Sequence, residues 1–446
     1  MRRYEVIVIG SGLAGLTCAW ELVRRRHRVL VLERESVIGG RTSSWEENGM
    51  LVESGFHRMI GYYRALPRLL ESVGVSPNDI FYWEREIDIL KDRQTQATFG
   101  IAPVYAPLRF LRGLAANNDL IGPMGKLSLL PFFIRGLYDS LVRPHELDRL
   151  SVLDYARQCG VSSEAVTWLV KPLTTGIFFL PIERFSAYVF FGLMRPAVPR
   201  FYRMQIGAFL GGMTEVMMRP IAEAIERHGG EVQTGVCADQ LLVEHGRVSG
   251  VIVRGEPIRA KETVVATSLG AAKRLLAPHF SSRPSFASLF ALPTMPAVTV
   301  QLEMDQPSRP HDRTTFAPET VLSSFAEQSR TTFRHVPGRL SIIIGDPERW
   351  IKASGEAILS QVYADASTIG LPLSGHVRQS RVISHPEDFH SLAPGYDHLR
   401  PGQQTDVPGL TLAGDYTRQP YFATMEGAVL SGQRAAAIVA RRFDGG

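Results

Sequence analysis

The chain has 446 residues, of which 45% are hydrophobic and 21% are charged, a composition typical of folded globular proteins. Its length suffices for two or three domains of about 100–200 residues each. The net charge of +5 comes from scattered arginines and lysines, which argues against a nucleic-acid surface. The three cysteines stand far apart in no metal-binding or redox spacing, so we expect buried thiols in a reducing compartment and no metal site.

The first predicted unit, residues 4–33, is a strand, a tight turn, a helix and a second strand. Three glycines in G-x-G-x-x-G spacing follow the first strand: Gly10, Gly12 and Gly15. Such glycines let the backbone approach a pyrophosphate, which the N–H groups and dipole of the following helix stabilise. Glu33 ends the second strand, where a carboxylate accepts hydrogen bonds from ribose hydroxyls. Its charge disfavours NADP, and the pattern predicts a site for NAD or FAD.

A second glycine motif follows the second strand at once: Gly39, Gly40, Arg41 and Thr42. It resembles the extended fingerprint of the glutathione-reductase-type FAD proteins, in particular the flavin amine oxidase and phytoene desaturase superfamily. The resemblance implies FAD as the cofactor, with Arg41 near its phosphates. It also implies an α/β fold: a Rossmann FAD domain with a β-meander, a β-sheet substrate domain and a helical, membrane-facing insertion.

Residues 42–52 are predicted to form a hairpin with its turn at Asn48-Gly49. Gly55, Phe56 and His57 then return the chain to the cofactor. In the desaturase family a Gly-x-His at this point belongs to the FAD site. A surface or helix-capping role for this single histidine remains open.

Residues 61–205 are predicted to form a largely helical insertion. Between residues 104 and 141, leucines and aromatic residues are interrupted by isolated cations, as in helices whose apolar side enters a membrane interface. An amphipathic helix packed on the protein's own core explains the same composition. Pro131 is expected to divide this stretch into short helices.

No uncharged apolar run reaches about 18 residues, so no transmembrane helix is expected. No signal peptide is expected before the first strand. We therefore expect a cytoplasmic protein, peripheral on the inner face of the membrane.

Residues 206–270 are predicted to return to the FAD domain, with Val236 as the main-chain adenine contact that the resemblance implies. Residues 271–389, where a short helix is stopped by Pro278, are expected to form a substrate-domain sheet over the cofactor. Residues 390–446 complete a discontinuous FAD domain with 1–60 and 206–270.

The closing stretch, residues 407–436, contains a strand that ends at Gly414-Asp415 and a helix that begins near Met425. Asp415 suits a ribityl hydroxyl, and the helix N-terminus directs its positive end toward the flavin ring. The sequence from Gly414 to Gly432 resembles the C-terminal signature of plant- and cyanobacterial-type phytoene and ζ-carotene desaturases and of their squalene-associated relatives.

This resemblance covers nearly the whole chain, and together with the motifs it implies a set of FAD contacts: Gly10, Gly12, Leu13, Ala14, Gly15, Glu33, Arg34, Gly40, Arg41, Thr42, Gly55, Phe56, His57, Val236, Gly414, Asp415, Met425, Glu426 and Ala428. Tyr421 and Met425 are expected to flank the substrate.

The family's chemistry implies hydride transfer from a long isoprenoid hydrocarbon to flavin N5, with a quinone or oxygen as acceptor. Plant-type phytoene desaturases carry an arginine directly after the glutamate that corresponds to Glu215, where this chain has Val216. A squalene-type substrate or another carotenoid reaction therefore stays open. The alternatives are an amine oxidase on a soluble amine, a redox-neutral carotenoid isomerase, and a prenyl chaperone without redox chemistry. The sequence leaves the oligomeric state open.

Overall fold

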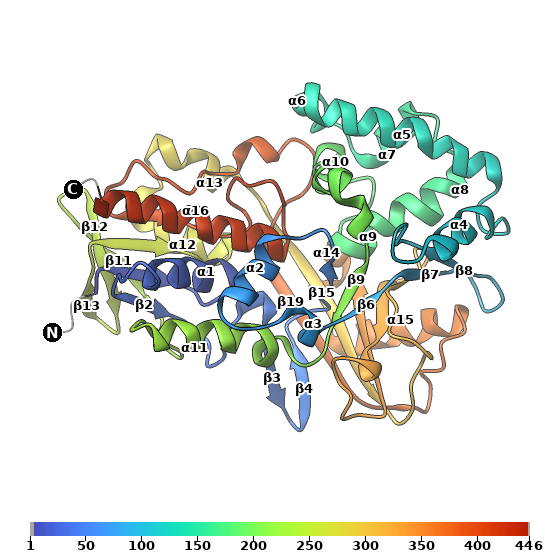
Figure 1. Cartoon of the computed structure of the whole chain (residues 1–446), viewed down its shortest axis with the longest axis horizontal. Helices are drawn as coiled ribbons and strands as arrows, with labels where there is room; N and C mark the ends of the chain where they lie inside the picture. Colours follow the sequence, from blue (N-terminus) through green and yellow to red (C-terminus); the bar gives the residue numbers. More distant parts are fainter. Residues whose placement is uncertain (1–3, 445–446) are drawn as a thin grey trace.

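The computed structural model describes residues 4–444 (Figure 1). A sheet of five parallel strands lies at the end of the molecule that holds both termini. Its spatial order is β10 (Glu231–Gln233), β2 (Val29–Leu32), β1 (Val6–Ile9), β14 (Glu262–Val265) and β20 (Leu410–Leu412). The central strand, β1, pairs with β2 and β14 over its whole length, and all three are apolar or buried throughout. Strands buried on both faces are typical of parallel sheets covered by helices.

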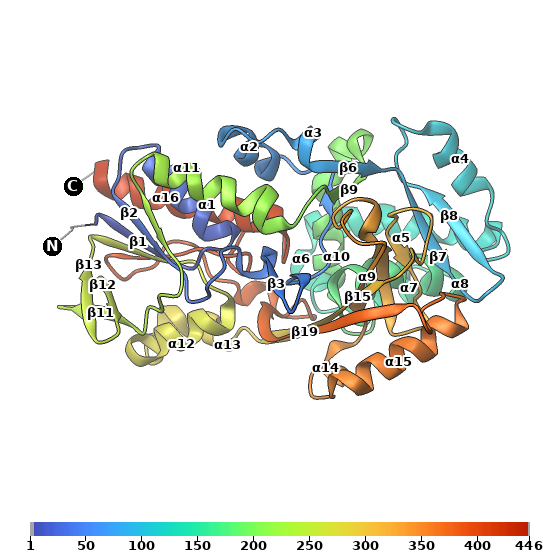
Figure 2. The same cartoon turned by 90° about the horizontal axis from the view of Figure 1, so that it is seen from below.

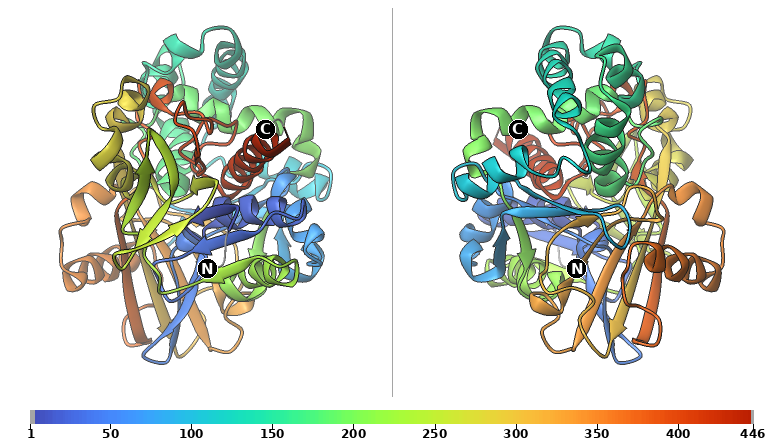
Figure 3. Two further views of the ribbon diagram at one scale, coloured as in Figure 1. Left: turned by 90° about the vertical axis from the view of Figure 1, so that its left-hand side faces the viewer. Right: turned by 90° about the vertical axis from the view of Figure 1, so that its right-hand side faces the viewer.

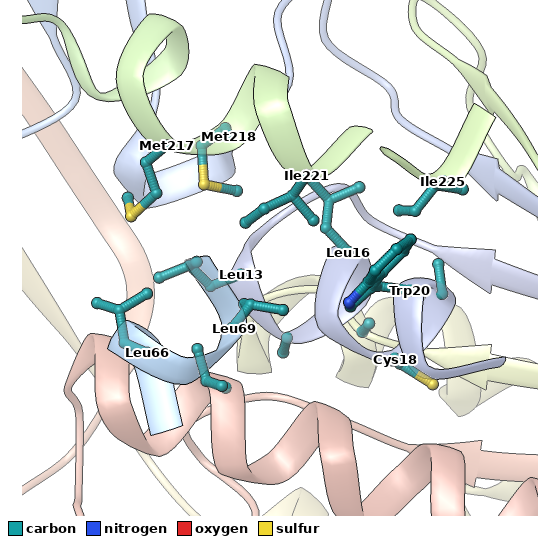
Figure 4. Packing of buried hydrophobic residues seen from close by; sticks show 14 of the residues in the cluster. Leu13, Leu16, Cys18, Trp20, Leu66, Leu69, Met217, Met218, Ile221 and Ile225 are labelled. Atoms are coloured by element: carbon teal, nitrogen blue, oxygen red, sulfur yellow. The ribbon is translucent and has the colours of Figure 1, made fainter. Parts of the chain in front are cut away.

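Helices cover one face of this sheet: α1 (Leu13–Val23), α11 (Arg219–Arg227) and α16 (Met425–Asp444) (Figure 2). The other face carries α12 (Leu269–Phe280), α13 (Ala287–Ala291) and the small sheet of β11 (Gln240–Glu244), β12 (Arg247–Val253) and β13 (Glu256–Arg259). The α1 side chains Leu13, Leu16 and Trp20 meet residues of α11 and of α2 (Ala65–Ser72) in one core (Figure 4). The predicted strand–turn–helix–strand unit is confirmed.

A second sheet has seven strands in the order β19 (Val377–His390), β15 (Thr294–Met304), β18 (Gly338–Ile344), β17 (Leu322–Glu327), β16 (Thr315–Phe316), β7 (Glu86–Leu90) and β8 (Gln96–Gly100). In Figure 3 the five-stranded sheet is nearer to the viewer in the left panel, and the seven-stranded sheet is nearer in the right panel. A third, small sheet contains β5 (Met59–Ile60), β9 (Ile206–Phe209) and β6 (Phe81–Glu84). The prediction that residues 61–205 are helical therefore misses β6, β7 and β8. The alternation of polar and apolar residues from Glu86 to Ile89 has the period of a strand.

The remaining helices of residues 61–205 lie at the end of the molecule away from the termini (Figure 1). Besides α2 and α3 (Pro77–Ile80), they are α4 (Pro107–Ala115), α5 (Pro123–Val142), α6 (Pro144–Leu147), α7 (Val152–Gln158), α8 (Ser163–Ala165), α9 (Lys171–Phe178) and α10 (Ala187–Met194). Between residues 4 and 444, no helix combines the length and the apolar character needed to cross a membrane.

Two prolines that were expected to end helices lie inside them. Pro131 lies within α5, and Pro278 lies within α12. A proline leaves the carbonyl four residues earlier without its helical partner. Here both prolines and the residues four positions earlier, Leu127 and Arg274, are exposed, so water can serve as that partner.

Two other local expectations had opposite outcomes. The hairpin of β3 (Ser44–Glu47) and β4 (Met50–Glu53) is confirmed, and its turn residues Asn48 and Gly49 both have positive φ. Of the three thiols, Cys18 is buried, but Cys237 is exposed, against the expectation.

A buried arginine ties this hairpin to the seven-stranded sheet. Arg339 on β18 is fully buried, and its guanidinium donates to Glu303 Oε1 at 3.0 Å and to the carbonyl of Leu51 at 2.9 Å. Glu53, at the end of β4, accepts the N–H of Met213 at 3.2 Å. Burial raises the pKa of Glu53 from 4.5 to about 7, against the opposing effect of the Met213 hydrogen bond and nearby arginines.

The Glu53→Gln variant tests this burial. Because the folded pKa lies above the ordinary value, the contribution of Glu53 to stability is present below about pH 4.5 and is lost as the pH rises through about 7. The variant should therefore have a higher Tm than the wild type near pH 8, and this difference should disappear near pH 5. Circular dichroism melts check it, with Glu46→Gln, an exposed residue of the same hairpin, as the control. An equal Tm difference at both pH values would contradict it.

Candidate active site

A cavity of about 1450 Å³ runs from the end of β1 into the helical region. Small-molecule pockets usually measure about 300–1000 Å³, so this one has room for a dinucleotide and a second ligand. Most residues of the predicted cofactor set line it: Gly10, Gly12, Leu13, Ala14, Glu33, Arg34, Gly40, Arg41, Thr42, Phe56, His57, Val236, Gly414, Asp415, Met425 and Ala428. Gly15, Gly55, Tyr421 and Glu426 do not line it.

Two glycines at the start of α1 differ in what they make room for. A Cβ on Gly15 would lie 1.9 Å from the carbonyl oxygen of Gly10, so glycine is needed there for α1 to pack on β1. Gly12 has an ordinary φ of −66°, and a Cβ there would meet nothing in the described chain closer than Gly39 O at 3.9 Å. The space beside Gly12 belongs to the cavity and faces the unpaired N–H groups of the first helical turn. A pyrophosphate fits this position.

Glu33 is held by the serine inside the glycine turn. The N–H and Oγ of Ser11 donate to Glu33 Oε2 at 2.9 and 2.7 Å, and the N–H of Glu35 donates to Oε1 at 3.0 Å. Oε2 thus already accepts two hydrogen bonds, whereas Oε1 can accept one more, so a ribose hydroxyl can still bind at Oε1. The N–H of Val236 donates to the Glu33 carbonyl at 2.8 Å, which leaves the Val236 carbonyl for an adenine. Sequence reasoning missed Ser11, whose only signal is its place between two glycines.

Arg41 and Asp415 form an ion pair in the cavity wall although 374 residues separate them. Two guanidinium N–H groups donate to the two carboxylate oxygens at 3.0 and 2.6 Å. The guanidinium also lies 4.6 Å from the centre of the Phe389 ring. Burial alone would raise the pKa of Asp415, but the charge and hydrogen bonds of Arg41 hold it below its ordinary value. The phosphate role of Arg41 and the ribityl role of Asp415 stay predictions, and the pair places both residues in one wall.

His57 stands in the same cavity as a neutral base. Burial, with smaller contributions from the charges of Arg41 and His385, lowers its pKa to about 4 against the opposing effect of a backbone hydrogen bond to Gly55. Among the described residues, its Nδ1 has no hydrogen-bond partner. A buried nitrogen without a partner is costly, and a cofactor bound beside it could satisfy this group.

Two of the predicted site residues, Glu426 and Tyr421, have side chains that do not line the cavity. The carboxylate of Glu426 accepts three backbone N–H groups at the N-terminus of α2, from Arg64, Ala65 and Leu66, at 2.7, 2.8 and 2.9 Å. The ring of Tyr421 packs edge-on against Tyr63, with centroids 5.7 Å apart. Since Tyr63 lines the cavity and Tyr421 does not, Tyr421 lies one layer behind the wall.

The other end of the cavity, which we call the apolar arm, is lined by Phe133, Leu137, Leu173, Ile177, Phe178, Phe190, Leu193, Met194, Ala197, Val198 and Phe201. Three of these side chains, Ile177, Val198 and Phe201, are also exposed at the molecular surface. The apolar arm therefore reaches the surface. The hydrophobic character of this region is visible in the sequence, whereas its place in a cavity wall depends on the fold.

Exposed hydrophobic side chains are concentrated in the same part of the chain. Tyr82 apart, every large exposed hydrophobic residue between positions 4 and 444 belongs to residues 104–202. The apolar patch comprises Val104, Tyr105, Leu108, Leu111, Leu114, Met124, Leu127, Leu130, Ile134, Tyr138, Leu141, Val142, Ile177, Val198, Phe201 and Tyr202. Concentrations of this kind mark surfaces that contact a partner or a membrane.

Val216, the departure from the plant-type pattern, lies outside the cavity. It belongs to the π-helical turn Thr214–Met218, where its neighbour Glu215 pairs with Arg219 at 2.8 Å. Val216 is not among the residues that line the cavity.

Comparisons with known proteins show what the whole chain is similar to. The model of a family described as flavin containing amine oxidoreductase matches residues 13–440. The chain is 29% identical to 15-cis-phytoene desaturase of Synechococcus elongatus, over 98% of this chain and 96% of the relative. It is 27% identical to zeta-carotene desaturase of Synechocystis, over 98% and 97%. The crystal structure of an oxidoreductase from Methanosarcina mazei has the same fold, with a TM-score of 0.76 and 19% identity over 96% of this chain and 99% of that one.

The role of Glu426 at α2 gives a stability prediction. Glu426→Gln removes the negative charge from the helix N-terminus while keeping an acceptor, and we expect it to lower the free energy of unfolding by about 1 kcal/mol. Urea denaturation measures this. Glu356→Gln is the matched control, because Glu356 lies in the first turn of α15 (Gly355–Thr368) but is exposed. Equal stability of the two variants would contradict the capping role.

Proposed function

The chain belongs to the family of flavin containing amine oxidoreductases and uses FAD, and we propose that it oxidises a long isoprenoid hydrocarbon. The reaction would be a carotene desaturation or a related carotenoid or squalene redox step. The observation that carries the proposal is the cavity, in which the dinucleotide cradle continues into the apolar arm. The relatives named for phytoene and zeta-carotene desaturation support it.

FAD supplies the two-electron oxidation when it is bound. The chain's own residues supply binding and orientation. The N-terminus of α1 beside Gly12 receives the pyrophosphate, Glu33 receives the ribose, and the N-terminus of α16 at Met425 faces the cavity with its positive dipole end. The apolar arm orients a hydrocarbon by shape and excludes water from the carbon atoms that react.

The apolar arm favours a hydrocarbon over the alternatives. No carboxylate occurs among its described lining residues, so a protonated amine would enter without a counter-charge. A chaperone would not need the built cofactor cradle at Gly12 and Glu33. A redox-neutral carotenoid isomerase would use the same cavity, and only the product distinguishes it from a desaturase.

We infer that the apolar patch binds a membrane surface peripherally. Leu108 and Met124 are 82% and 77% exposed, and Ile134 is 69% exposed. Cations stand among them in the sequence, at Arg112, Lys126, Arg135 and Arg143. Helices that insert shallowly have this combination, with apolar side chains in the acyl region and cations at the headgroups. A lipid substrate and a lipid quinone could then enter the apolar arm from the bilayer, with oxygen as the other candidate acceptor.

Flavin absorption, and its loss on reduction, tests the cofactor and the substrate together. The purified protein should show flavin absorption bands, and these bands should bleach under anaerobic conditions with phytoene or hydroxysqualene in liposomes. Bleaching by a soluble amine such as putrescine, and by neither lipid, would contradict the proposed substrate class. Phytoene converted to a geometric isomer without bleaching would favour the isomerase.

A charge introduced into the apolar patch tests whether this surface binds membranes. Ile134→Asp places a charge in the apolar patch, and we expect liposome binding to fall at least about tenfold, since a charge enters the interface unfavourably. Co-sedimentation with liposomes measures this. Tyr82→Asp is the control, because Tyr82 is exposed but lies outside the apolar patch. Equal binding by both variants would exclude the patch as the membrane surface.

A further inference from the structure

A histidine on the seven-stranded sheet lines the same cavity as the cofactor motifs. His385 lies on β19 opposite Ala297 of β15, and its side chain lines the cavity. Its Nδ1 lies 3.0 Å from Asp388 Oδ2, and its Nε2 lies 2.7 Å from the carbonyl oxygen of Ser54. The contact with Ser54 joins two segments that are 331 residues apart in the sequence.

Both partners of this ring are hydrogen-bond acceptors. The Ser54 carbonyl can only accept. Asp388 already accepts the hydroxyl of Ser268 at 2.9 Å, and the His385 hydrogen bond is the main cause that lowers its pKa to about 2. Asp388 is therefore ionised at neutral pH. A neutral imidazole has one N–H and could satisfy only one of the two acceptors, whereas an imidazolium satisfies both.

Ser54 connects this histidine to the cofactor motifs. The hydroxyl of Ser54 donates to the Arg41 carbonyl at 2.5 Å and accepts the N–H of Ser43 at 3.2 Å. The residues after Ser54 lead directly to His57 in the cavity. Four positions along β19, Phe389 lies under the Arg41 guanidinium. The strand thus holds the segments around Arg41 and Ser54 at two points, through His385 and through Phe389.

We propose that His385 is a positioning residue of the flavin site, where its imidazolium ties the Ser54 carbonyl to the Asp388 carboxylate and fixes the turn from Ser54 to His57. The proposal rests on the proposed function only in its use of FAD. Its consequences are two. The turn is rigidly placed for the cofactor, and one cation, paired with one carboxylate, lies in the wall beside Arg41.

The test uses the purified holoenzyme. His385→Gln keeps a donor for one acceptor but removes the cation, and His385→Ala removes both donors. Both variants should release FAD at least about ten times faster than the wild type, as followed by flavin fluorescence, a factor that corresponds to about 1.4 kcal/mol. The flavin midpoint potential should become more negative, because a cation that favours the negatively charged reduced flavin is lost. Asp388→Asn should release FAD at an intermediate rate.

The chain offers a matched control in a second histidine–aspartate pair. His376 Nδ1 lies 2.9 Å from Asp305 Oδ1 beside the same sheet, but neither residue lines the cavity. His376→Gln should leave both FAD release and potential unchanged. If His385→Ala does not fold, His385→Gln, whose side chain has a similar size, tests the proposal by itself.

Unchanged release and potential in His385→Gln would overturn the proposal, as would a lowered Tm with an unchanged potential, which is the signature of a purely structural role. A wild-type protein without flavin would overturn both the cofactor and this proposal. If neither lipid reduces the flavin, the isoprenoid substrate is excluded. The rates of FAD release would still test the role of His385.

Discussion

The ion pair between Arg41 and Asp415 is the constraint on which the cavity depends. It joins the turn after β2 to the turn after β20, so two loops from opposite ends of the chain form one wall. A buried pair contributes little net stability compared with apolar residues of the same shape, but removal of one partner costs about 3–5 kcal/mol. Its geometry is therefore more important than its energy. The bidentate contact fixes the distance and the orientation of both loops before any ligand arrives.

The same pair explains how a cofactor site and an apolar arm come to share one cavity. The carboxyl ends of the parallel strands present the cradle at the edge of the five-stranded sheet, as in other open α/β sheets. The seven-stranded sheet approaches this edge through β19 and, by way of Arg339, through the β3–β4 hairpin. The two sheets meet at these contacts. The helices that follow β7 and β8 in the chain then lie at the end of the cavity, where they supply the lining of the apolar arm.

Local sequence patterns predicted the cofactor half of the cavity. The other features of the site depend on contacts between distant parts of the chain, which the sequence does not show. The glycines around Ser11, the acid at Glu33 and the helix at Met425 were predictable because each role depends on a turn, a strand end or a helix end within a few residues. The role of Glu426 was not, because its partners belong to a helix 360 residues away in the sequence. His385 carries no motif, and only the pairing of β19 with β15 brings it to Ser54. Pro131 was misjudged because its effect depends on which side of α5 faces outward.

The distribution of charge along the cavity argues for the class of ligand. In the cofactor half the charges that we have followed are matched: Arg41 faces Asp415, His385 faces Asp388, and Glu33 accepts N–H groups. Beyond His57, which is neutral at physiological pH, the residues of the apolar arm carry no charge, and the nearby Arg58 in the cavity wall is paired with Asp312. A ligand with a charged group would have to leave its hydration at this point without a partner, at a cost of several kcal/mol. A long hydrocarbon meets no such cost on the same path, because its surroundings stay apolar when it leaves a lipid phase, and relative to water each buried methylene is stabilised by about 0.8 kcal/mol. The cavity thus discriminates by polarity before any residue-specific contact is made, which is the selectivity that a substrate drawn from a lipid phase requires.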